Sequence, residues 1–348
     1  MIYGPAVQSK GGVPLPVDII AEIGVNHDGS IDRAKALMVD AMRAGATTVK
    51  FQMFRSDEIV SEDAELADYQ KENLSSSMSQ SAMLRHLELS SEQMAELMSY
   101  ASELGVEFLC TAFDIDSLHW LMSQGQKRIK IASGEITNYF LLSEIARLNQ
   151  PVLLSTGMAS VDEIEAALDL LLSGNRSAGD ITLLQCTSSY PTQLNEANIN
   201  ALAFMRKRFN LEVGFSDHTT SFHSALAAVA LGATVIEKHV TYNRDAEGPD
   251  HKASADLAEF AEYVHHIRMV EVVLGELNKV PTNSELSTAR SARRSLVAAH
   301  QVTTGEPFTR ENLRARRPGT GISPMEFAKL EGRPSNRNYQ PGDLVQLD

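Results

Sequence analysis

The sequence contains little cysteine and no long apolar run. Its 348 residues include only two cysteines, Cys110 and Cys186, too few for the disulfide framework of a small secreted protein. No stretch approaches the roughly 20 consecutive apolar residues of a membrane-spanning helix. Residues 1–16 have neither the basic start nor the apolar core of a signal peptide. We therefore expect a cytoplasmic protein in a reducing environment.

An excess of positive charge is also missing. The chain has 31 Lys and Arg against 45 Asp and Glu, a formal net charge of −14. Nucleic acids and anionic membranes require a basic surface, so neither is an expected partner. An anionic substrate would have to be held by lysines placed locally, because the overall charge of the protein repels it.

The chain instead carries a regular alternation of strand-like and helix-like segments. Hydrophobic residues make up 43% of the sequence and charged residues 22%, as in ordinary globular proteins. The length suits one large domain and a small one. Eight strands are predicted at residues 18–23, 47–52, 106–111, 128–131, 152–155, 181–186, 213–215 and 235–241. Eight helices are predicted at 31–43, 91–104, 115–122, 139–148, 161–172, 198–209, 224–232 and 255–274.

Strict alternation predicts parallel strands joined by right-handed crossovers. Eight such units over about 250 residues match a closed (β/α)8 barrel, the TIM barrel, in the α/β class. The alternative is a doubly wound open sheet, but its Gly-x-Gly-x-x-Gly motif is absent after the first strand. The polar segment at residues 55–81 is longer than a structural connection needs and is a candidate substrate-covering loop.

The active site of a TIM barrel lies at the carboxyl ends of its strands. Every predicted strand ends in polar groups here, which one or two structural ion pairs would not explain. The candidates are Glu22, Asn26, Lys50, Gln52, Thr111, Asp114, Lys130, Ser133, Glu135, Ser155, Thr156, Thr187, Ser188, Tyr190, Ser216, Asp217, His218, Lys238 and His239.

These residue types indicate a chemistry. Lysines with several hydroxyls can hold a phosphate group without a Walker loop. His218 and His239 follow two successive strands, and two neutral imidazoles facing one cavity can bind a divalent metal ion. The simpler interpretation is that each histidine caps its strand by hydrogen bonds. Glu22, in an apolar strand, is a candidate general acid or base.

The composition changes beyond Gly275. Residues 278–283 lack an apolar period and contain a proline, so we predict a barrel domain at 1–277, a linker at 278–289 and a small domain at 290–348. The small domain has short β-type segments separated by turns. With about 60 residues it is marginal in stability on its own, and we expect it to pack on another surface. It is basic because of Arg290, Arg293, Arg294, Arg310, Arg314, Arg316 and Arg317.

Uncommon motifs, in order along nearly the whole chain, resemble those of the sialic acid synthase family. They are Ala21-Glu-Ile-Gly-Val-Asn-His-Asp-Gly29, Lys50-Phe-Gln52, Lys130-Ile-Ala-Ser-Gly-Glu135, Ser155-Thr-Gly-Met158, Cys186-Thr-Ser-Ser-Tyr-Pro191, Gly214-Phe-Ser-Asp-His218 and Glu237-Lys-His239. The tail, with Arg317-Pro-Gly-Thr-Gly321, resembles the family's antifreeze-like (SAF) domain. The resemblance implies a TIM barrel followed by a small, mostly β SAF domain.

The resemblance also implies a reaction. Members of the family condense phosphoenolpyruvate with an N-acylated hexosamine and release phosphate. A divalent metal ion, Mn²⁺ or Mg²⁺, would bind His218 and His239 and polarise the sugar aldehyde. Glu22 would serve the proton and water steps. The implied catalytic residues are therefore Glu22, His218 and His239.

The same resemblance assigns the substrate contacts. Phosphoenolpyruvate would be held by Lys50, Thr111, Lys130, Ser133, Ser155, Ser188 and Ser216. The sugar would contact Gln52, Asn73, Glu135, Tyr190 and Asp250. Arg317 would reach the N-acyl group from the partner subunit of a domain-swapped homodimer. Ser188 stands where the family often has Asn, and Gln193 where proline is frequent.

Several alternatives remain for the activity. The main expectation is N-acetylneuraminate synthase with N-acetylmannosamine as acceptor. The alternative within the family is N,N′-diacetyllegionaminate synthase with a 2,4-diacetamido-trideoxy-mannose acceptor. A non-catalytic sugar-binding barrel is a third possibility, although Glu22 and both histidines are retained. A barrel aldolase could instead form a Schiff base through Lys130 or Lys238 without a metal ion.

Overall fold

The computed structural model describes residues 16–61, 64, 66, 79–174 and 176–346. The chain divides into two compact units, Met1–Glu276 and Leu277–Asp348, and each is described by itself. In the part of the chain that is described, no helix is long and apolar enough to cross a membrane.

The first unit is a closed parallel barrel. Its strands are β1 (Asp18–Gly24), β2 (Thr48–Met53), β3 (Glu107–Ala112), β4 (Ile129–Ile131), β5 (Val152–Ser155), β6 (Ile181–Cys186), β7 (Glu212–Asp217) and β8 (Val235–Thr241). Each strand pairs with the next, and β1 also pairs with β8, which closes the barrel. A short strand, β9 (Ala255–Asp256), extends the pairing of β8. The predicted TIM barrel is therefore confirmed.

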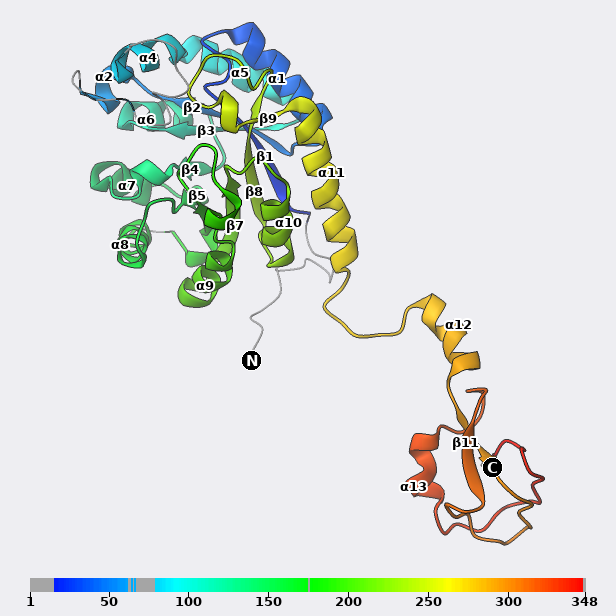
Figure 1. Cartoon of the computed structure of the whole chain (residues 1–348). Helices are drawn as coiled ribbons and strands as arrows, with labels where there is room; N and C mark the ends of the chain where they lie inside the picture. Colours follow the sequence, from blue (N-terminus) through cyan, green and yellow to red (C-terminus); the bar gives the residue numbers. More distant parts are fainter. Residues whose placement is uncertain (1–15, 62–63, 65, 67–78, 175, 347–348) are drawn as a thin grey trace. The chain divides into compact units, whose positions relative to one another are not determined.

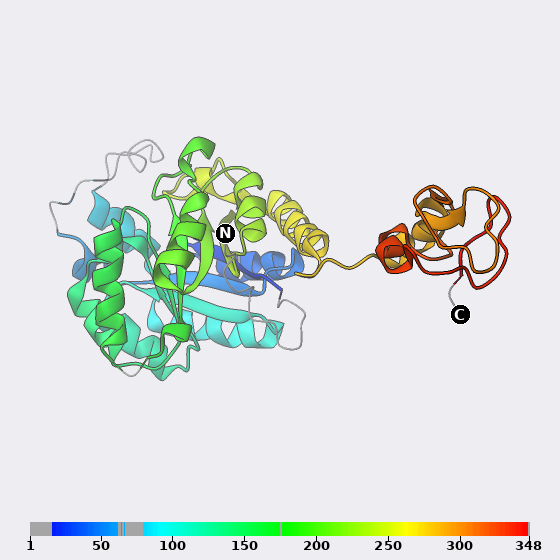
Figure 2. The same cartoon turned by 90° about the horizontal axis from the view of Figure 1, so that it is seen from below.

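Helices surround the strands in both views (Figure 1, Figure 2). They are α1 (Ile31–Arg43), α2 (Ser56–Ile59), α4 (Gln80–Leu87), α5 (Ser91–Leu104), α6 (Ile115–Ser123), α7 (Tyr139–Ala146), α8 (Val161–Leu172), α9 (Asn200–Phe209), α10 (His223–Ala230) and α11 (Leu257–Leu274). Ser30 caps α1, as its sequence position predicts. The segment predicted as a long loop contains α2 and the start of α4, and most of the rest lies outside the described residues.

The strands bury side chains on both faces. Outward-facing residues such as Ile19, Ala21 and Ile23 of β1 pack in the large core between strands and helices. A second, smaller cluster consists of Ile20, Leu109, Leu153, Leu184 and Val235. Four of the five lie two residues before a polar residue of the same strand (Glu22, Thr111, Ser155 and Glu237), and Leu184 lies two before Cys186. The cluster therefore faces the inside of the barrel and forms an apolar floor there.

The second unit has its own core and an antiparallel sheet, as expected for the small domain. Strands β10 (Ser295–Ala298) and β11 (Leu313–Arg316) pair antiparallel, and α13 (Phe327–Leu330) follows. Its core is Leu296, Ala298, Val302, Phe308, Leu313, Leu330, Tyr339 and Val345. Part of the predicted linker is helical, because Thr282 provides a capping box for α12 (Asn283–Ala292).

Gly214 in β7 allows the neighbouring strand to approach closely. A Cβ atom at this position would lie 2.6 Å from both Leu184 Cδ2 and the Val235 carbonyl oxygen. Gly214→Ala should therefore lower the free energy of unfolding by about 1–3 kcal/mol, measured by urea denaturation. The control is Gly179→Ala, whose Cβ would meet only Ser177 Oγ at 3.7 Å. Equal stability of the two variants would contradict the close approach.

Candidate active site

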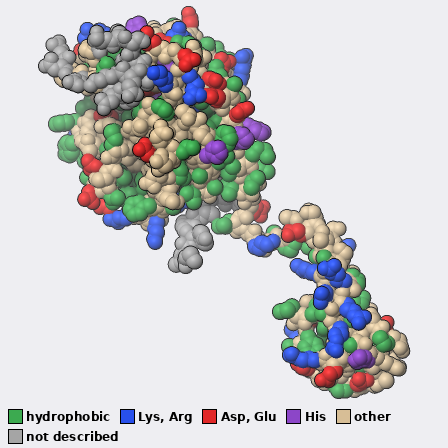
Figure 3. Space-filling model, in the orientation of Figure 1, with side chains coloured by type: hydrophobic (Ala, Val, Ile, Leu, Met, Phe, Trp, Pro, Cys, Tyr) green, Lys and Arg blue, Asp and Glu red, His purple; other side chains and the backbone are tan. Residues whose placement is uncertain are grey.

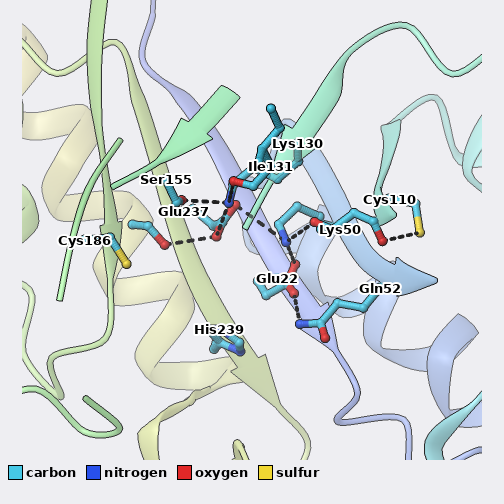
Figure 4. A network of polar contacts seen from close by, with 12 residues as sticks. Glu22, Lys50, Gln52, Cys110, Lys130, Ile131, Ser155, Cys186, Glu237 and His239 are labelled. Atoms are coloured by element: carbon cyan, nitrogen blue, oxygen red, sulfur yellow. Dashed lines mark hydrogen bonds and ion pairs between the residues drawn. The ribbon is translucent and has the colours of Figure 1, made fainter. Parts of the chain in front are cut away.

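A buried cluster of charged groups lies inside the barrel (Figure 4). Lys50 Nζ lies 2.6 Å from Glu22 Oε2 and donates a hydrogen bond to Thr111 Oγ1 at 3.2 Å. Gln52 Nε2 donates to Glu22 Oε1 at 2.8 Å. Glu22, Lys50 and Thr111 are each at most 3% exposed. Three adjacent strands thus bring four of the predicted site residues together.

The other half of the cluster comes from β4, β5, β7 and β8. Lys130 Nζ donates to Ser155 Oγ at 2.7 Å, and Ser216 Oγ donates to Glu237 Oε1 at 3.0 Å. The Glu237 carboxylate lies 3.7 Å from Lys50 Nζ and 3.7 Å from Lys130 Nζ. One buried carboxylate therefore lies near two buried ammonium groups.

The sequence analysis gave Glu237 no role, although it stands in the motif that ends in His239. The signal was the two-residue period of a strand: Glu237 and His239 lie two positions apart in β8 and so face the same side. A strand residue on the same face as a candidate ligand is itself a candidate for the site.

The two lysines differ in proton affinity. Burial lowers the pKa of Lys130, and the charge of Lys50 adds to that effect. Burial acts in the same direction on Lys50, but the carboxylates of Glu22 and Glu237 outweigh it and raise the pKa of Lys50. Burial alone would raise the pKa of Glu237, but the two lysines lower it. The cluster therefore contains one strongly held proton and one weakly held proton on its two ammonium groups.

Two serine hydroxyls lie next to Gly157, beside this cluster of charges. The Gly157 N–H donates to Ser133 Oγ at 3.0 Å, and Ser133 begins the 3₁₀ turn Ser133–Glu135 after β4. A Cβ atom on Gly157 would lie 2.4 Å from Ser188 Oγ and 2.7 Å from Ser133 Oγ. The glycine thus lets two hydroxyls from different loops meet at its backbone, a suitable lining for an anion.

The two histidines are neighbours, as their strand positions predicted. The ring centroids of His218 and His239 are 5.4 Å apart, and the Tyr190 ring lies 4.1 Å from the His218 ring. His239 Nδ1 is buried without a hydrogen-bond partner and lies 3.7 Å from Asp250 Oδ2. Burial, followed by the positive charge of His218 and of nearby lysines, holds the pKa of His239 well below its usual value. Its ring is therefore neutral near pH 7.

His218 is held in one orientation. Its Nδ1 lies 2.8 Å from the Thr187 carbonyl oxygen, which can only accept, so Nδ1 carries the proton and Nε2 of the neutral ring has a free lone pair. Burial acts to lower the pKa of His218, but Cys186, whose Sγ lies 3.7 Å from Nδ1, and the Thr187 carbonyl raise it overall. A metal ion would have to displace any second proton on this ring.

The histidine pair fits an open metal site rather than a closed one. Among the described residues, no group of three or more His, Cys, Asp and Glu side chains is arranged to hold a metal ion. The two rings offer an unpartnered nitrogen on His239 and a free lone pair on His218. Two imidazole ligands would leave the remaining coordination positions of a divalent metal ion to water and other oxygen atoms, as in an open site.

The predicted sugar contacts are only partly in the described structure. Asn138 Nδ2 donates to Glu135 Oε2 at 2.7 Å, and burial raises the pKa of Glu135. Burial, followed by the charge of Glu22, raises the pKa of Asp250 to about 6. Asn73 lies outside the described residues. Arg317 is exposed in the second unit, directly after β11.

Two other predicted strand-end candidates, Lys238 and Asp217, make contacts with the helix layer and with nearby backbone instead of joining the charged cluster. Lys238 Nζ donates to the Thr219 and Asp217 carbonyls and lies over the Tyr263 ring of α11, whose hydroxyl donates to Asp217 Oδ2 at 2.8 Å. Lys238 and Asp217 therefore face the helix layer, not the cavity, because their neighbours in β7 and β8 take the inner positions. The Schiff-base alternative at Lys238 is wrong for this reason.

His27 fixes the loop that follows Glu22. The Gly29 N–H donates to His27 Nδ1 at 3.0 Å, and burial lowers the pKa of His27 to about 4. Gly24 has φ +56°, and a Cβ there would lie 3.0 Å from Glu22 Oε1 and 3.2 Å from Gln52 Nε2. The loop therefore closes tightly against the Glu22 carboxylate.

Polar groups from every strand or strand-end loop meet at the carboxyl end of a closed parallel barrel, which defines the chain as a TIM-barrel enzyme. Residues 37–279 match the NeuB family, and residues 293–348 match the SAF domain. The chain therefore belongs to the NeuB family. It is a phosphoenolpyruvate-dependent condensing synthase of the sialic acid type.

Relatives cover nearly the whole chain. The N,N′-diacetyllegionaminic acid synthase of Campylobacter jejuni is 42% identical over 94% of this chain and 98% of that protein. The enzyme of the same name from Legionella pneumophila is 41% identical over 96% and 94%. The crystal structure of the N-acetylneuraminic acid synthetase from Leptospira borgpetersenii, in complex with citrate, has a TM-score of 0.70 and 32% identity, covering 79% and 90%. The expected family is therefore confirmed.

The low pKa of His27 predicts a pH dependence of stability. The pKa is 6.5 in the unfolded chain and about 4 in the fold, so the neutral ring stabilises the fold above pH 6.5. This contribution is lost as the pH falls towards 4, because only the unfolded chain takes up the proton. The stability advantage of wild type over His27→Asn should shrink by about 3 kcal/mol over this range.

Urea denaturation between about pH 7 and about pH 4 measures the difference. Other titrating groups contribute equally to both proteins and cancel. His27→Gln should give the same slope with a different offset, since it also lacks the imidazole. A stability difference that does not change with pH would show that His27 is not buried as a neutral ring.

Proposed function

We propose that this protein is an N,N′-diacetyllegionaminate synthase. It would condense phosphoenolpyruvate with 2,4-diacetamido-trideoxy-mannose and water, giving N,N′-diacetyllegionaminate and phosphate. The observation that carries the proposal is the joint presence, in one barrel, of the Lys50–Lys130 pair and the His218–His239 pair. The choice of acceptor is supported by the names of the two relatives that are 42% and 41% identical.

Phosphoenolpyruvate would bind in the lower layer of the cavity. Lys50 and Lys130 supply charge-assisted hydrogen bonds to its phosphate and carboxylate groups. Locally placed lysines are required because the protein as a whole carries a net charge of −14. The hydroxyls proposed to complete the contacts are those of Thr111, Ser133, Ser155, Ser188 and Ser216.

In the proposed reaction, carbon 3 of phosphoenolpyruvate forms a bond to the aldehyde carbon of the open-chain sugar, the C=O π bond breaks, and the aldehyde oxygen takes up a proton to become a hydroxyl. Water then adds to the electron-poor carbon 2, and the bond from carbon 2 to the phosphate oxygen breaks, releasing phosphate. Mn²⁺ or Mg²⁺ held by His218 and His239 would supply Lewis-acid polarisation of the aldehyde. Glu22, which contacts Gln52 and Lys50, would take the proton of the attacking water.

The acceptor would lie above phosphoenolpyruvate, near the histidines. Tyr190 packs against His218, and Asp250 lies beside His239. The raised pKa values of Glu135 and Asp250 let these groups exchange hydrogen bonds with uncharged hydroxyl and acetamido groups at low desolvation cost. We assign Gln52 and Asn73 to the same sugar-binding group.

We further propose a domain-swapped homodimer in which Arg317 contacts the N-acyl group bound by the partner barrel. Lys and Arg side chains gather on the second unit (Figure 3), while the protein overall is acidic. The loop that carries Arg317 is fixed from within its own unit: Ser295 Oγ donates to the Pro318 carbonyl at 2.7 Å and accepts from the Gly321 N–H at 2.8 Å. A cytoplasmic location is supported by two buried free cysteines.

Phosphate release from phosphoenolpyruvate tests the proposed reaction. We expect release only with a sugar acceptor, loss of activity with EDTA, and recovery with Mn²⁺. The kcat/KM should be at least about tenfold higher for the diacetamido sugar than for N-acetylmannosamine, because a site built for the second acetamido group leaves polar groups unpaired without it. Glu22→Gln should abolish release.

The other outcomes are informative. A preference for N-acetylmannosamine would replace the proposed acceptor by the main expectation from sequence. Release with neither sugar would favour a non-catalytic sugar-binding barrel. Inactivation by borohydride in the presence of pyruvate would point to a Schiff base at Lys130.

Mixing two inactive variants tests the swapped dimer. Arg317→Ala keeps its own Glu22, and Glu22→Ala keeps its own Arg317, so a heterodimer contains one complete site if Arg317 acts across the interface. Random exchange of subunits should then restore about one quarter of wild-type activity. Each variant alone is the control, and gel filtration verifies the dimer. Verified heterodimers without activity would rule out the trans arrangement.

A further inference from the structure

Glu237 has no task in the reaction described above. Its side chain is 4% exposed and points from β8 into the barrel, towards Lys50 and Lys130 (Figure 4). Ser216 Oγ donates to Oε1, whereas Oε2 has no hydrogen-bond partner. A buried carboxylate oxygen without a hydrogen bond is costly, so its retention in this place calls for a physical reason.

The two lysines depend on Glu237 unequally. Lys50 has a carboxylate of its own, Glu22 Oε2, at 2.6 Å, and Glu237 is its second at 3.7 Å. In the described residues, Glu237 is the only carboxylate within 4.0 Å of Lys130 Nζ. The hydrogen bonds of Lys130 go to neutral oxygens, Ser155 Oγ at 2.7 Å and the Ile131 carbonyl at 3.4 Å. Glu237 is therefore the counter-charge of Lys130.

The contact of Glu237 with each lysine is electrostatic rather than hydrogen-bonded. Both separations are 3.7 Å, beyond the range of a normal N–H···O bond. A carboxylate at this distance compensates the charge of an ammonium group, yet leaves the N–H groups free to bind an incoming anion. A closer ion pair would have to break before the substrate could bind.

We propose that Glu237 is a positioning residue for the phosphate-bearing substrate: it keeps Lys130 charged and aligned beside Lys50, without occupying the hydrogen bonds that the substrate needs. This inference rests on the proposed function. It identifies Glu237 as the group that keeps Lys130 able to bind the anionic substrate. Glu237 does not contact the reacting atoms in this role and acts through Lys130.

The charged and titratable groups around Lys130 come from several strands. Glu237 on β8 and Glu22 on β1 favour its charged form, as does Cys186 on β6, whereas Lys50 on β2 and burial oppose it. Replacing Glu237 with Gln removes the nearest favourable charge and keeps the shape and the Ser216 hydrogen bond. Lys130 should then lose its proton at a lower pH, and binding of phosphoenolpyruvate should fail from that pH upward.

The test compares Glu237→Gln with wild type in the full-length, metal-loaded enzyme, from about pH 6 to about pH 10. We expect the KM for phosphoenolpyruvate near pH 8 to rise at least about tenfold, with the KM for the sugar within about threefold. The basic limb of kcat/KM for phosphoenolpyruvate should move down by about one pH unit or more. Glu237→Asp, which keeps the charge but shortens its reach, should lie between the two proteins.

Glu107→Gln is the matched control. Glu107 begins β3 at the opposite end of the barrel, where its Oε1 lies 2.9 Å from Arg128 Nε, so its loss should leave the KM for phosphoenolpyruvate and the basic limb in place. If Glu237 served only to fill the barrel, a folded Glu237→Gln would likewise keep both values, and that result would overturn the inference. Should the Gln variant not fold, a Glu237→Asp profile identical to wild type would overturn it equally.

Failure of the proposed function is distinguishable from failure of this inference. If wild type binds phosphoenolpyruvate but releases no phosphate with either sugar, the proposed reaction is wrong. The same pair of proteins is then compared by calorimetric binding of phosphoenolpyruvate. A tenfold weaker Kd for Glu237→Gln would still support the role of Glu237, and equal Kd values would end it.

Discussion

Four buried charges determine what the interior of this barrel can contain. Glu22, Lys50, Lys130 and Glu237 lie within ion-pair distance along one chain of contacts, directly above an apolar floor. Charges in such a place are tolerated only when each has a partner, and removal of one from a buried pair typically costs about 3–5 kcal/mol. The four strands that carry them must therefore keep their register, and the closed barrel is what keeps it.

The polar groups form two levels with different chemistry. The lower level contains Lys50, Lys130 and Glu237 with the hydroxyls of Thr111 and Ser155, and Glu22 lies opposite His239 in the β1–β8 pairing. The upper level contains His218 and His239 with Tyr190. The lower level suits a compact anion and the upper level suits oxygen atoms that a metal ion can polarise. In β8, Glu237 belongs to the lower level and His239, two residues further along the strand, to the upper level.

Much of this could be predicted from sequence, since alternating segments imply a barrel and a barrel places strand ends together. Lys50, Lys130 and the two histidines were found in this way. The missing information was which alternate residues of each strand face the barrel interior and which face the helices. Without it, Lys238 was counted as a strand-end candidate although it packs against Tyr263, and Glu237 was given no task although it faces the cavity. The helix at Asn283–Ala292 was missed because its capping box lies in a segment without an apolar period.

The apolar floor has a consequence for the order of events. Ile20, Leu109, Leu153, Leu184 and Val235 close the barrel from below with side chains that are at most 5% exposed, so ligands can arrive and depart only through the mouth. A ligand that binds deeper in the barrel has to pass the position of the ligand nearer the mouth. We expect a ligand of the charged level to enter before a ligand of the histidine level. For the proposed reaction, we therefore expect phosphoenolpyruvate to bind before the sugar.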